Sequence, residues 1–332
     1  MRAAYYRLKG PAVEVLKVGD LPSPEPGPGE VRVRVVVSGV NPSDTKQRNG
    51  WGGDQSMPFP LIVPHNDGSG VVEAVGLGVP ASRLGERVWI YEAQHGGRAF
   101  GTAAESVVVP AANVVGLPDG ASFDDGACLG VPGMTAHRLL FGDGGIQGQN
   151  VLVQGGAGSV GHLAVQLARW AGAKVIATVG SSEQAEIAAE SGAHLTLNYK
   201  TDDVPGRVTD FLGAKSGVDR VIEVSFVRNL ELNTKILKSN GIISTYSIGE
   251  ETTPATVSLW PLLIKGITVH YTMVYAMTQE AHQRAADDLN SALSAGALRP
   301  HIARRFPLSK IAAAHDLLGN GGAGGKVLIE IG

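Results

Sequence analysis

The sequence predicts an α/β fold in which an all-β unit precedes a doubly wound parallel sheet. Up to about residue 120, short apolar runs are separated by Gly and Pro, as in antiparallel β structure. Beyond about residue 123, apolar strands alternate with helical segments, as in parallel sheets. The 332 residues exceed the size that one hydrophobic core usually serves, so we expect two domains with a cleft.

The first part is predicted to form short strands at 31–37, 70–75, 87–91 and 106–109. Prolines at 22, 24, 26 and 28 have no amide hydrogen, which indicates an extended connector ahead of the first of these strands.

The second part is predicted to contain a six-stranded sheet. Its strands are expected at 151–154, 174–179, 195–199, 218–224, 241–246 and 267–271, with a helix at 159–170. The chain then continues through helices at 279–295 and 308–318 to a last apolar strand at 326–331. Because that strand has no evident partner in the parallel sheet, we expect it to return to the β unit.

A glycine-rich turn joins the first strand of this sheet to its helix. A pyrophosphate needs backbone amides at close range and the positive end of a helix, and side chains at Gly155 and Gly158 would block its approach. Gly161 allows the helix to pack tightly on the strand. The strand-turn-helix context favours a dinucleotide site over a merely structural turn. The predicted binding residues are Gly155, Gly156, Ala157, Gly158, Ser159, Val160 and Gly161.

The tip of the next strand predicts which dinucleotide binds. About 20 residues beyond the glycines, where NAD-binding proteins place a carboxylate, this chain has Gly180, Ser181 and Ser182. Hydroxyl groups accept a 2′-phosphate that a carboxylate would repel, so NADPH is favoured over NADH. The two serines are equally suited to cap the following helix.

Composition narrows the class of protein. A net charge of −3 without a basic cluster excludes nucleic acid as the default partner, and no segment has the apolar length of a signal peptide or membrane span. We therefore expect a cytoplasmic protein that acts on small molecules. The single cysteine, Cys128, excludes intrachain disulfides, and no serine or cysteine occupies a nucleophile motif.

Several further segments, taken in order, resemble one known family. They are Gly39 to Asp44 (GVNPSD), Pro64 to Gly70 (PHNDGSG) with Val71 to Gly76 (VVEAVG), Gly130 to Ala136 (GVPGMTA), the glycine turn with Ala164 to Ala168 (AVQLA), Asn198-Tyr199, and Gly324 to Leu328 (GGKVL). Over essentially its whole length, the chain resembles the zinc-independent quinone oxidoreductases, the zeta-crystallin-like branch of the medium-chain dehydrogenase/reductase superfamily.

The resemblance implies a GroES-like catalytic domain formed by residues 1–123 and 272–332, and a Rossmann NADP-binding domain at 124–271. It implies that Asn41 and Thr135 lie near the nicotinamide and that Tyr199 borders the adenosine 2′-phosphate. It also implies a homodimer joined at the edge of the Rossmann sheet, around 257–271. Taken singly, Asn41 suits a turn before a proline and Thr135 a helix start. The nicotinamide channel would be lined by Ser225, Ser247 and Ile248.

The same register indicates that no zinc is bound. Zinc-dependent relatives place a metal-binding Cys at the position of Asn41, a His followed by Glu at Asn66 and Asp67, and a Cys or Asp near Val131. The residues of this chain do not make a good zinc ligand set. His65 lies one residue from a ligand position, and a single His without a thiolate partner more often satisfies a loop than holds a metal.

Without zinc to polarise a carbonyl, the expected reaction is hydride transfer from NADPH to an electron-poor acceptor, foremost a quinone. Reduction of α,β-unsaturated carbonyls (enals, enones or enoyl thioesters) is the alternative enzymatic hypothesis. An NADPH-binding protein with little turnover is the alternative from another class. The catalytic residues are expected to be Asn41, which would orient the nicotinamide or the substrate oxygen, Thr135 beside it, and Lys46, which would stabilise the developing oxyanion.

Two departures from the family pattern bear on these expectations. Lys46 replaces a frequent tyrosine, and its commoner role is that of a solvated surface charge. Gln184 replaces a lysine that often grips the 2′-phosphate, which weakens the argument for NADPH. Trp51, Met57 and Phe59 are expected either to shape an apolar substrate pocket or to serve as ordinary packing.

Overall fold

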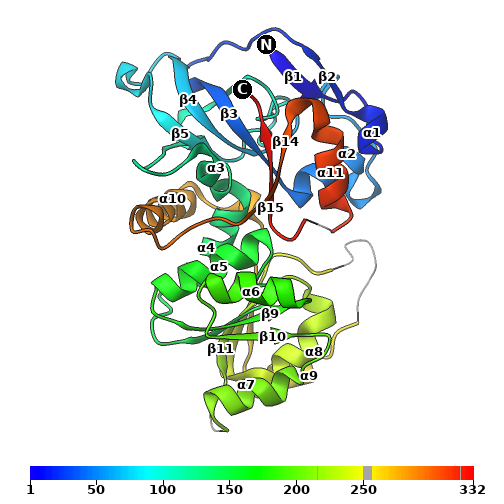
Figure 1. Cartoon of the computed structure of the whole chain (residues 1–332), viewed down its shortest axis with the longest axis vertical. Coiled ribbons are helices and arrows are strands. Elements are labelled where there is room, and N and C mark those ends of the chain that lie inside the picture. Colours follow the sequence, from blue (N-terminus) through cyan, green and yellow to red (C-terminus); the bar gives the residue numbers. More distant parts are fainter. Residues whose placement is uncertain (215, 250–255, 322) are drawn as a thin grey trace. The chain divides into compact units, whose positions relative to one another are not determined.

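The computed structural model describes residues 1–214, 216–249, 256–321 and 323–332. The chain forms two compact units, the first from Met1–Pro132 with Pro300–Gly332 and the second from Gly133–Arg299 (Figure 1).

The first unit is built on a largely antiparallel sheet. Over the described residues its strand order is β14-β15-β3-β4-β5-β7, with β6 also paired to β3. These strands are β3 (Glu30–Val40), β4 (Asp67–Val75), β5 (Arg87–Ile90), β6 (Ser106–Pro110), β7 (Val114–Gly116), β14 (Ile302–Pro307) and β15 (Lys326–Glu330). A separate antiparallel pair, β1 (Arg2–Tyr5) and β2 (Lys17–Asp20), precedes them. The helices are α1 (Ala12–Val15), α2 (Pro42–Asn49), α3 (Phe123–Gly126) and α11 (Ile311–Gly319), with short turns η1 (Trp51–Gly53), η2 (Ala81–Arg83), η3 (Ala111–Asn113), η4 (Leu129–Gly133) and η6 (Leu308–Lys310).

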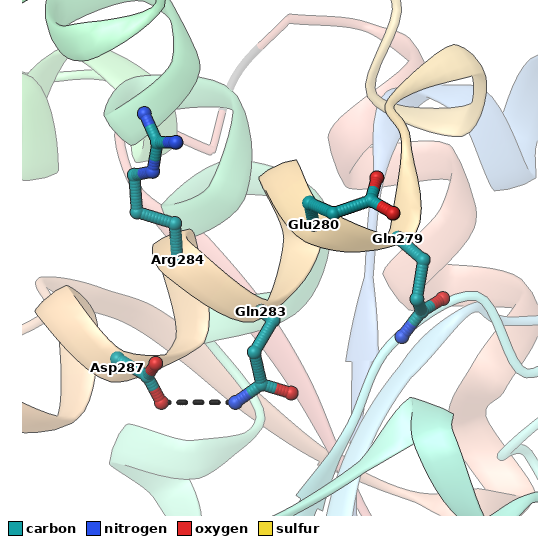
Figure 2. A pocket seen from close by; sticks show the side chains of 5 residues that line it. All are labelled: Gln279, Glu280, Gln283, Arg284 and Asp287. Carbon is teal, nitrogen blue, oxygen red and sulfur yellow. Dashed lines mark hydrogen bonds between the residues drawn. The ribbon is translucent and has the colours of Figure 1, made fainter.

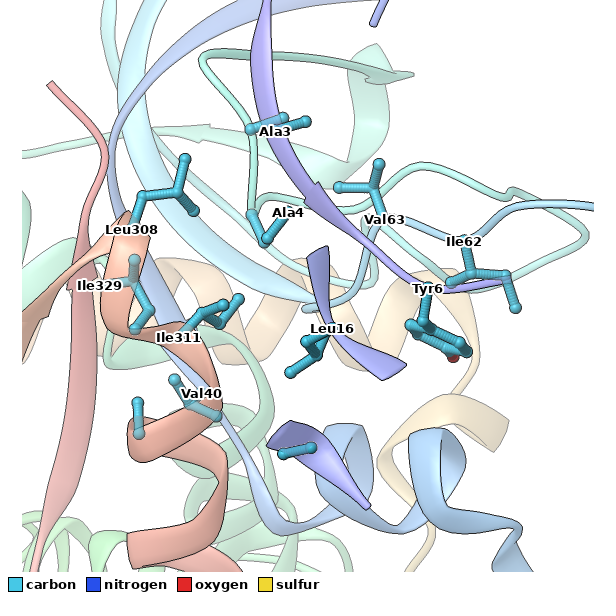
Figure 3. Close-up of a cluster of buried hydrophobic side chains, with 14 of the residues drawn as sticks. Ala3, Ala4, Tyr6, Leu16, Val40, Ile62, Val63, Leu308, Ile311 and Ile329 are labelled. Carbon is cyan, nitrogen blue, oxygen red and sulfur yellow. The ribbon is translucent and has the colours of Figure 1, made fainter. Parts of the chain in front are cut away.

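The last strand returns to the β unit, which confirms the expectation from the sequence. β15 pairs antiparallel with β3, Val327 opposite Val40. Figure 3 shows the resulting apolar core, in which Ile311 of α11 and Ile329 of β15 pack with Leu16 and with residues of β1. Since these buried side chains come from both ends of the chain, the first unit is complete only when the C-terminal segment is in place.

The second unit contains the predicted six-stranded parallel sheet. Its order over the described residues is β10-β9-β8-β11-β12-β13, and every neighbouring pair is parallel. The strands are β8 (Asn150–Val153), β9 (Lys174–Val179), β10 (Leu195–Asn198), β11 (Val218–Glu223), β12 (Leu237–Thr245) and β13 (Thr268–Tyr271). The helices are α4 (Met134–Phe141), α5 (Ser159–Trp170), α6 (Ser182–Glu190), α7 (Val204–Leu212), α8 (Phe226–Ile236), α9 (Trp260–Lys265) and α10 (Gln279–Ser294), with the short turn η5 (Val274–Ala276).

The borders of the two units differ from the predicted domain borders. They fall at 132/133 and 299/300 instead of 123/124 and 271/272. The physical reason at the second border is α10, which packs on α4, where His137 Nε2 and Asp288 Oδ2 lie 2.7 Å apart. Helix periodicity alone gives no sign of which unit an amphipathic helix will join.

Among the helices of the described ranges, none is long and apolar enough to cross a membrane.

Candidate functional site

The glycine turn lies at the carboxyl end of β8, directly before α5. Gly155 has a φ of 70°, a left-handed conformation that favours glycine. A Cβ on Gly161 would collide with the carbonyl oxygen of Gly155, so α5 could not approach the turn as closely with any other residue there. Gly158 is exposed as the N-cap of α5, and a Cβ there would meet only the Gly155 oxygen, at 3.4 Å. Packing within the chain therefore accounts for Gly161 but not for the lack of a side chain at Gly158, whose N donates to Gly155 O (3.0 Å).

The predicted 2′-phosphate residues follow the carboxyl ends of β9 and β10. Ser181 is the N-cap of α6, and its Oγ accepts a hydrogen bond from Gln184 N (3.3 Å). Gln184 folds back, and its Oε1 accepts from Gly180 N (2.8 Å). Tyr199 is exposed and lies against Gly180, since a Cβ there would be 2.8 Å from Tyr199 Oη. The cap interpretation of Ser181 is confirmed, and its hydroxyl hydrogen can still be donated to a ligand.

Parallel strands bring the remaining predicted cofactor residues to the same edge of the sheet. Ser225 follows β11, and Ser247 and Ile248 follow β12. Phe226 N donates to Ser247 O (3.2 Å), so the two segments are bonded to each other. Thr135 is buried in the first turn of α4. Ligands of open α/β sheets bind at this carboxyl edge.

Glu223, the last residue of β11, has a buried carboxylate held by neutral donors. Oε1 accepts from Ser225 N (2.5 Å) and Asn229 Nδ2 (2.9 Å), and Oε2 accepts from Asn233 Nδ2 (2.5 Å). Burial and, secondarily, this carboxylate raise the pKa of Tyr246. These bonds fix the loop that carries Ser225.

The same network reaches the glycine turn. Asn233 Oδ1 accepts from Gln154 Nε2 (3.0 Å), and Gln154 Oε1 accepts from Thr178 Oγ1 (2.5 Å). Gly155 N donates in turn to Thr178 Oγ1 (3.3 Å). This network was not predicted from the sequence. The feature that could have indicated it is a set of polar residues that end or follow apolar strands.

In the first unit, five polar side chains form a buried group that we call the Lys326 cluster. Asp67 is its centre, because Asp67 Oδ2 accepts from both Lys326 Nζ (2.8 Å) and Asn41 Nδ2 (2.8 Å). Lys326 Nζ also donates to Asn41 Oδ1 (2.7 Å). Lys326 is 2% exposed and Asp67 is 0% exposed, so this is an ion pair inside the protein. The members are Asn41, Asp44, Asn66, Asp67 and Lys326.

Asp44 is the member of the cluster whose carboxyl group is an unusually weak acid. Its Oδ2 accepts from Asn41 N (2.8 Å) and its Oδ1 from Asn66 Nδ2 (3.1 Å). Burial, and then the nearby Asp67 carboxylate, raise the pKa of Asp44 to about 7, while the Asn41 and Asn66 donors and Lys326 oppose the rise.

The side chains of the Lys326 cluster can be compared with those that a zinc ion needs as ligands. The Asn41 oxygen is bonded to an ammonium, and the Asn66 amide donates to Asp44. Val131 contributes only its backbone N, which donates to Asp67 Oδ1 (2.8 Å). An ammonium at this point repels a dication. Across the described ranges, no group of three or more His, Cys, Asp or Glu side chains is arranged to hold a metal. The residues therefore do not fit zinc.

His65 belongs to a buried hydrogen-bonded chain next to the cluster. Thr102 Oγ1 donates to Asp67 O (2.5 Å), so Ser38 Oγ must donate to Thr102 Oγ1 (2.7 Å). His65 Nδ1 must then donate to Ser38 Oγ (2.8 Å), which leaves His65 Nε2 as the acceptor of His315 Nε2–H (2.8 Å). The two imidazoles are thus a neutral pair. Depressed pKa values are consistent with neutral rings: burial lowers the pKa of His65 well below its usual range and the pKa of His315 to about 3.

Lys46 and the apolar residues predicted to shape a substrate pocket, Trp51, Met57 and Phe59, have different surroundings in the structure. Lys46 is half-buried on α2, with Nζ 5.4 Å from the ring centroid of Trp51. Met57 and Phe59 pack on the apolar core of the first unit, which favours the packing interpretation for these two residues. An oxyanion role for Lys46 stays a prediction.

A shallow hollow lies on the surface of α10 in the second unit. Figure 2 shows that its lining comes from one helix, with Gln283 Nε2 donating to Asp287 Oδ1 (2.9 Å). The lining side chains are hydrophilic and include both charge signs. The hollow contains none of the predicted site residues and is a solvated helix face.

Comparison with known families and proteins gives a consistent result. Residues 27–119 match the alcohol dehydrogenase GroES-like domain, and residues 159–291 match the zinc-binding dehydrogenase family. The chain is 33% identical to the quinone oxidoreductase of Rattus norvegicus, over 95% of this chain and 94% of the relative. It is 32% identical to a 2-haloacrylate reductase of Burkholderia, over 99% and 98%.

Solved structures agree with this similarity. A structure described as an NAD-dependent alcohol dehydrogenase matches with a TM-score of 0.89 and 30% identity, over all of both chains. The Escherichia coli quinone oxidoreductase, solved with NADPH, matches with a TM-score of 0.84 and 26% identity, over 99% of this chain and 100% of the other.

The two-unit fold and its glycine turn, together with these similarities, define an oxidoreductase of the medium-chain dehydrogenase/reductase superfamily. Within that superfamily, the chain belongs to the quinone oxidoreductase family. The resemblance inferred from its motifs is confirmed.

Proposed function

We propose that this protein is an NADPH-dependent quinone reductase that works without zinc. The observation that carries the proposal is the glycine turn at the carboxyl edge of a parallel sheet, in a chain whose full-length relatives are named quinone oxidoreductases.

NADPH is the proposed cofactor. The amides of the glycine turn and the start of α5 would hold the pyrophosphate, and Ser181, Ser182 and Tyr199 would surround the 2′-phosphate. Ser225, Ser247, Ile248, Thr135 and Asn41 would adjoin the nicotinamide. The E. coli relative was solved with NADPH, which supports the choice, whereas the alcohol dehydrogenase neighbour is described as NAD-dependent. The segment that follows β9, Gly180 to Ser182, has no carboxylate that would repel a 2′-phosphate, and this favours NADPH.

Independence from zinc rests on the Lys326 cluster. Its ammonium and its neutral amides do not suit a zinc ion, although the matching family model carries zinc in its name. Metal analysis of the purified protein tests this directly. We expect well under one zinc per chain and unchanged turnover after dialysis against a chelator. Stoichiometric zinc would overturn this part of the proposal.

The proposed chemistry needs little from the protein besides positioning. NADPH supplies the hydride, and a quinone accepts it readily because its product oxyanion is stabilised by the ring. One Asn41 Nδ2 hydrogen is bonded to Asp67, and the second would be donated to the nicotinamide amide or to an acceptor oxygen. Lys46 would stabilise the oxyanion, and solvent would deliver the final proton.

A second candidate function is the reduction of activated alkenes. It is favoured by the 32% identity to a 2-haloacrylate reductase over almost the whole of both chains. Such a substrate would present a carbonyl or carboxylate oxygen to the same donors.

The decisive experiment follows NADPH absorbance with an ortho-quinone, a para-quinone, a 2-alkenal, an enoyl thioester and a 2-haloacrylate. We expect the fastest oxidation with a quinone. Faster turnover with an alkene would transfer the assignment to the second candidate. Calorimetric NADPH binding without turnover on any acceptor would instead indicate a binding protein.

We also propose a homodimer formed at β13. This strand is the edge of the parallel sheet, and with α9 it exposes an apolar surface that includes Trp260 (65% exposed), Leu263 (70%) and Tyr271 (68%). An open edge with adjacent apolar side chains suits pairing with a second copy.

Sedimentation equilibrium should give twice the chain mass, and Leu263→Glu should reduce the protein to a monomer. Leu77→Glu, at a leucine of the first unit that is 81% exposed, should leave the dimer intact, and a monomeric wild type would refute the proposal. Cytoplasmic location stays a prediction.

A further inference from the structure

Lys326 is a buried cation that the proposed chemistry does not explain. It is the first residue of β15, and its ammonium donates to Asn41 and Asp67, the first of which is aligned by the family resemblance with a zinc-binding cysteine of zinc-dependent relatives. We propose that Lys326 is a positioning residue, an internal cation that fixes the orientation of the Asn41 side chain toward the cofactor and acceptor. This inference deepens the proposed function and rests on it for its kinetic consequences.

The bonding pattern allows Asn41 only one orientation. An ammonium can only donate, so it must face Asn41 Oδ1, and an ionised carboxylate can only accept, so Asp67 must face Asn41 Nδ2. Rotating the amide by 180° would place its NH₂ group against the ammonium and its oxygen against the carboxylate. Both contacts would be repulsive. The remaining Nδ2 hydrogen therefore points in one fixed direction.

The groups that hold Asn41 are themselves fixed. Asp67 Oδ1 accepts from Val131 N (2.8 Å), and Lys326 N donates to His301 O (3.0 Å). The lysine stem passes Gly39 so closely that a Cβ there would lie 2.9 Å from Lys326 Cε. Four segments, β3 with the start of α2, β4, η4 and β15, are thus joined through the Lys326–Asp67 ion pair and its hydrogen bonds. Such an arrangement holds the Asn41 side chain rigidly in one orientation.

The role predicts a specific pattern of defects. Lys326→Met keeps most of the stem and removes the donor that holds Asn41 Oδ1, so that only the Asp67 contact still restrains the amide. We expect kcat to fall by about 10- to 100-fold, as for other residues that orient a functional group. NADPH affinity should change less than threefold, because the pyrophosphate and 2′-phosphate residues belong to the other unit. Lys265→Met is the matched control. That ammonium also donates to buried carbonyls, those of Thr234 and Leu237, but it lies outside the proposed site.

A double-substitution cycle separates positioning from a merely structural role. If Lys326 acts through Asn41, then Lys326→Met should have almost no further effect on kcat in an Asn41→Ala background. Independent, multiplying effects would overturn the proposal. Because Lys326→Met leaves a buried carboxylate, the neutral pair Asp67→Asn with Lys326→Met is measured as well. The pair should fold like the wild type yet turn over as slowly as Lys326→Met, and wild-type turnover in the pair would also overturn the proposal.

A readout without turnover keeps this test distinct from the proposed function. In the unliganded protein, the Asn41 Nδ2 hydrogens should give two well-separated NMR signals, one protected from exchange by Asp67. Lys326→Met should accelerate that exchange at least about tenfold, whereas Lys265→Met should not. Unchanged exchange would refute the positioning role even in an active quinone reductase. Conversely, an enzyme inactive on every acceptor would refute the proposed function while this NMR result still stood.

Discussion

The glycine turn of the second unit and the Lys326 cluster of the first unit both belong to the proposed site, but they are built differently. The turn uses backbone, and its residues lie within a span of seven positions. The cluster uses side chains, and Lys326 is 285 positions from Asn41. Backbone geometry is encoded locally by glycine, whereas a buried ion pair exists only once distant strands have been paired. A glycine turn can therefore be predicted from the sequence, whereas a cluster of charges from distant segments cannot.

The largest effect is expected where the cluster loses its charge balance. Asp67→Ala leaves the Lys326 ammonium buried without its carboxylate, which should destabilise the fold by about 3–5 kcal/mol. Urea unfolding measures this loss. The control is Asp54→Asn, which removes a partner of Lys9 that is 64% exposed and should cost under about 1 kcal/mol. Equal costs for the two variants would show that the cluster is not the tightly coupled centre described here.

The next effect concerns the glycine turn. Gly161→Val places a side chain against the Gly155 carbonyl and forces α5 away from the turn. NADPH binding by calorimetry should weaken on the order of 100-fold, or about 2.7 kcal/mol. Gly145→Ala is the control, because a Cβ there meets nothing within 4 Å. Undiminished affinity in Gly161→Val would mean that the turn does not hold the pyrophosphate.

The stability of the protein should depend on pH through the buried histidines next to the Lys326 cluster. His65 and His315 have depressed pKa values when folded, so between about pH 6.5 and 3 the unfolded chain binds more protons than the folded one. Stability should therefore fall as the pH drops through that window, partly offset by Asp44, whose raised pKa acts in the opposite sense.

Replacing His315 by Gln should make the loss of stability between pH 7.5 and 5.5 smaller by about 1.4 kcal/mol in total, because an unfolded imidazole goes from mostly neutral to mostly protonated across that window. Unfolding free energies at pH 7.5 and 5.5 give this loss, and the exposed His270→Gln is the control. An unaltered loss in His315→Gln would contradict the neutral pair.

The smallest effect tests cofactor choice at the end of β9. Ser181→Asp keeps a good N-cap for α6, so the helix should remain intact while a carboxylate approaches the 2′-phosphate site. We expect kcat/KM for NADPH to fall about tenfold relative to NADH, or about 1.4 kcal/mol. Ser122→Asp, which adds the same charge at the N-cap of α3, should leave the ratio unchanged. A constant ratio in both variants would remove Ser181 from the specificity argument.

The limits of sequence reasoning are clearest in particular residues. Helix α5 and strand β9 begin and end where periodicity placed them, at 159–170 and 174–179. Asn41 was identified by its motif and Asp67 only by its register with a metal-binding position. Lys326 was seen merely as part of a strand, although a lysine that opens an apolar strand between glycines is an unusual residue to bury. The residues next to Lys326 in the sequence do not indicate which acidic side chain would pair with its ammonium group.

The sequence alone thus determined the six strands of the parallel sheet in chain order, the glycine turn with its helix, and the absence of a carboxylate at positions 180–182, because these depend on side-chain periodicity and backbone conformation over a few residues. Tertiary structure decided which charges meet. Pairing of β15 with β3 brought a cation to Asn41 and Asp67, and burial then made that contact obligatory, since neither charge could remain inside the protein without the other.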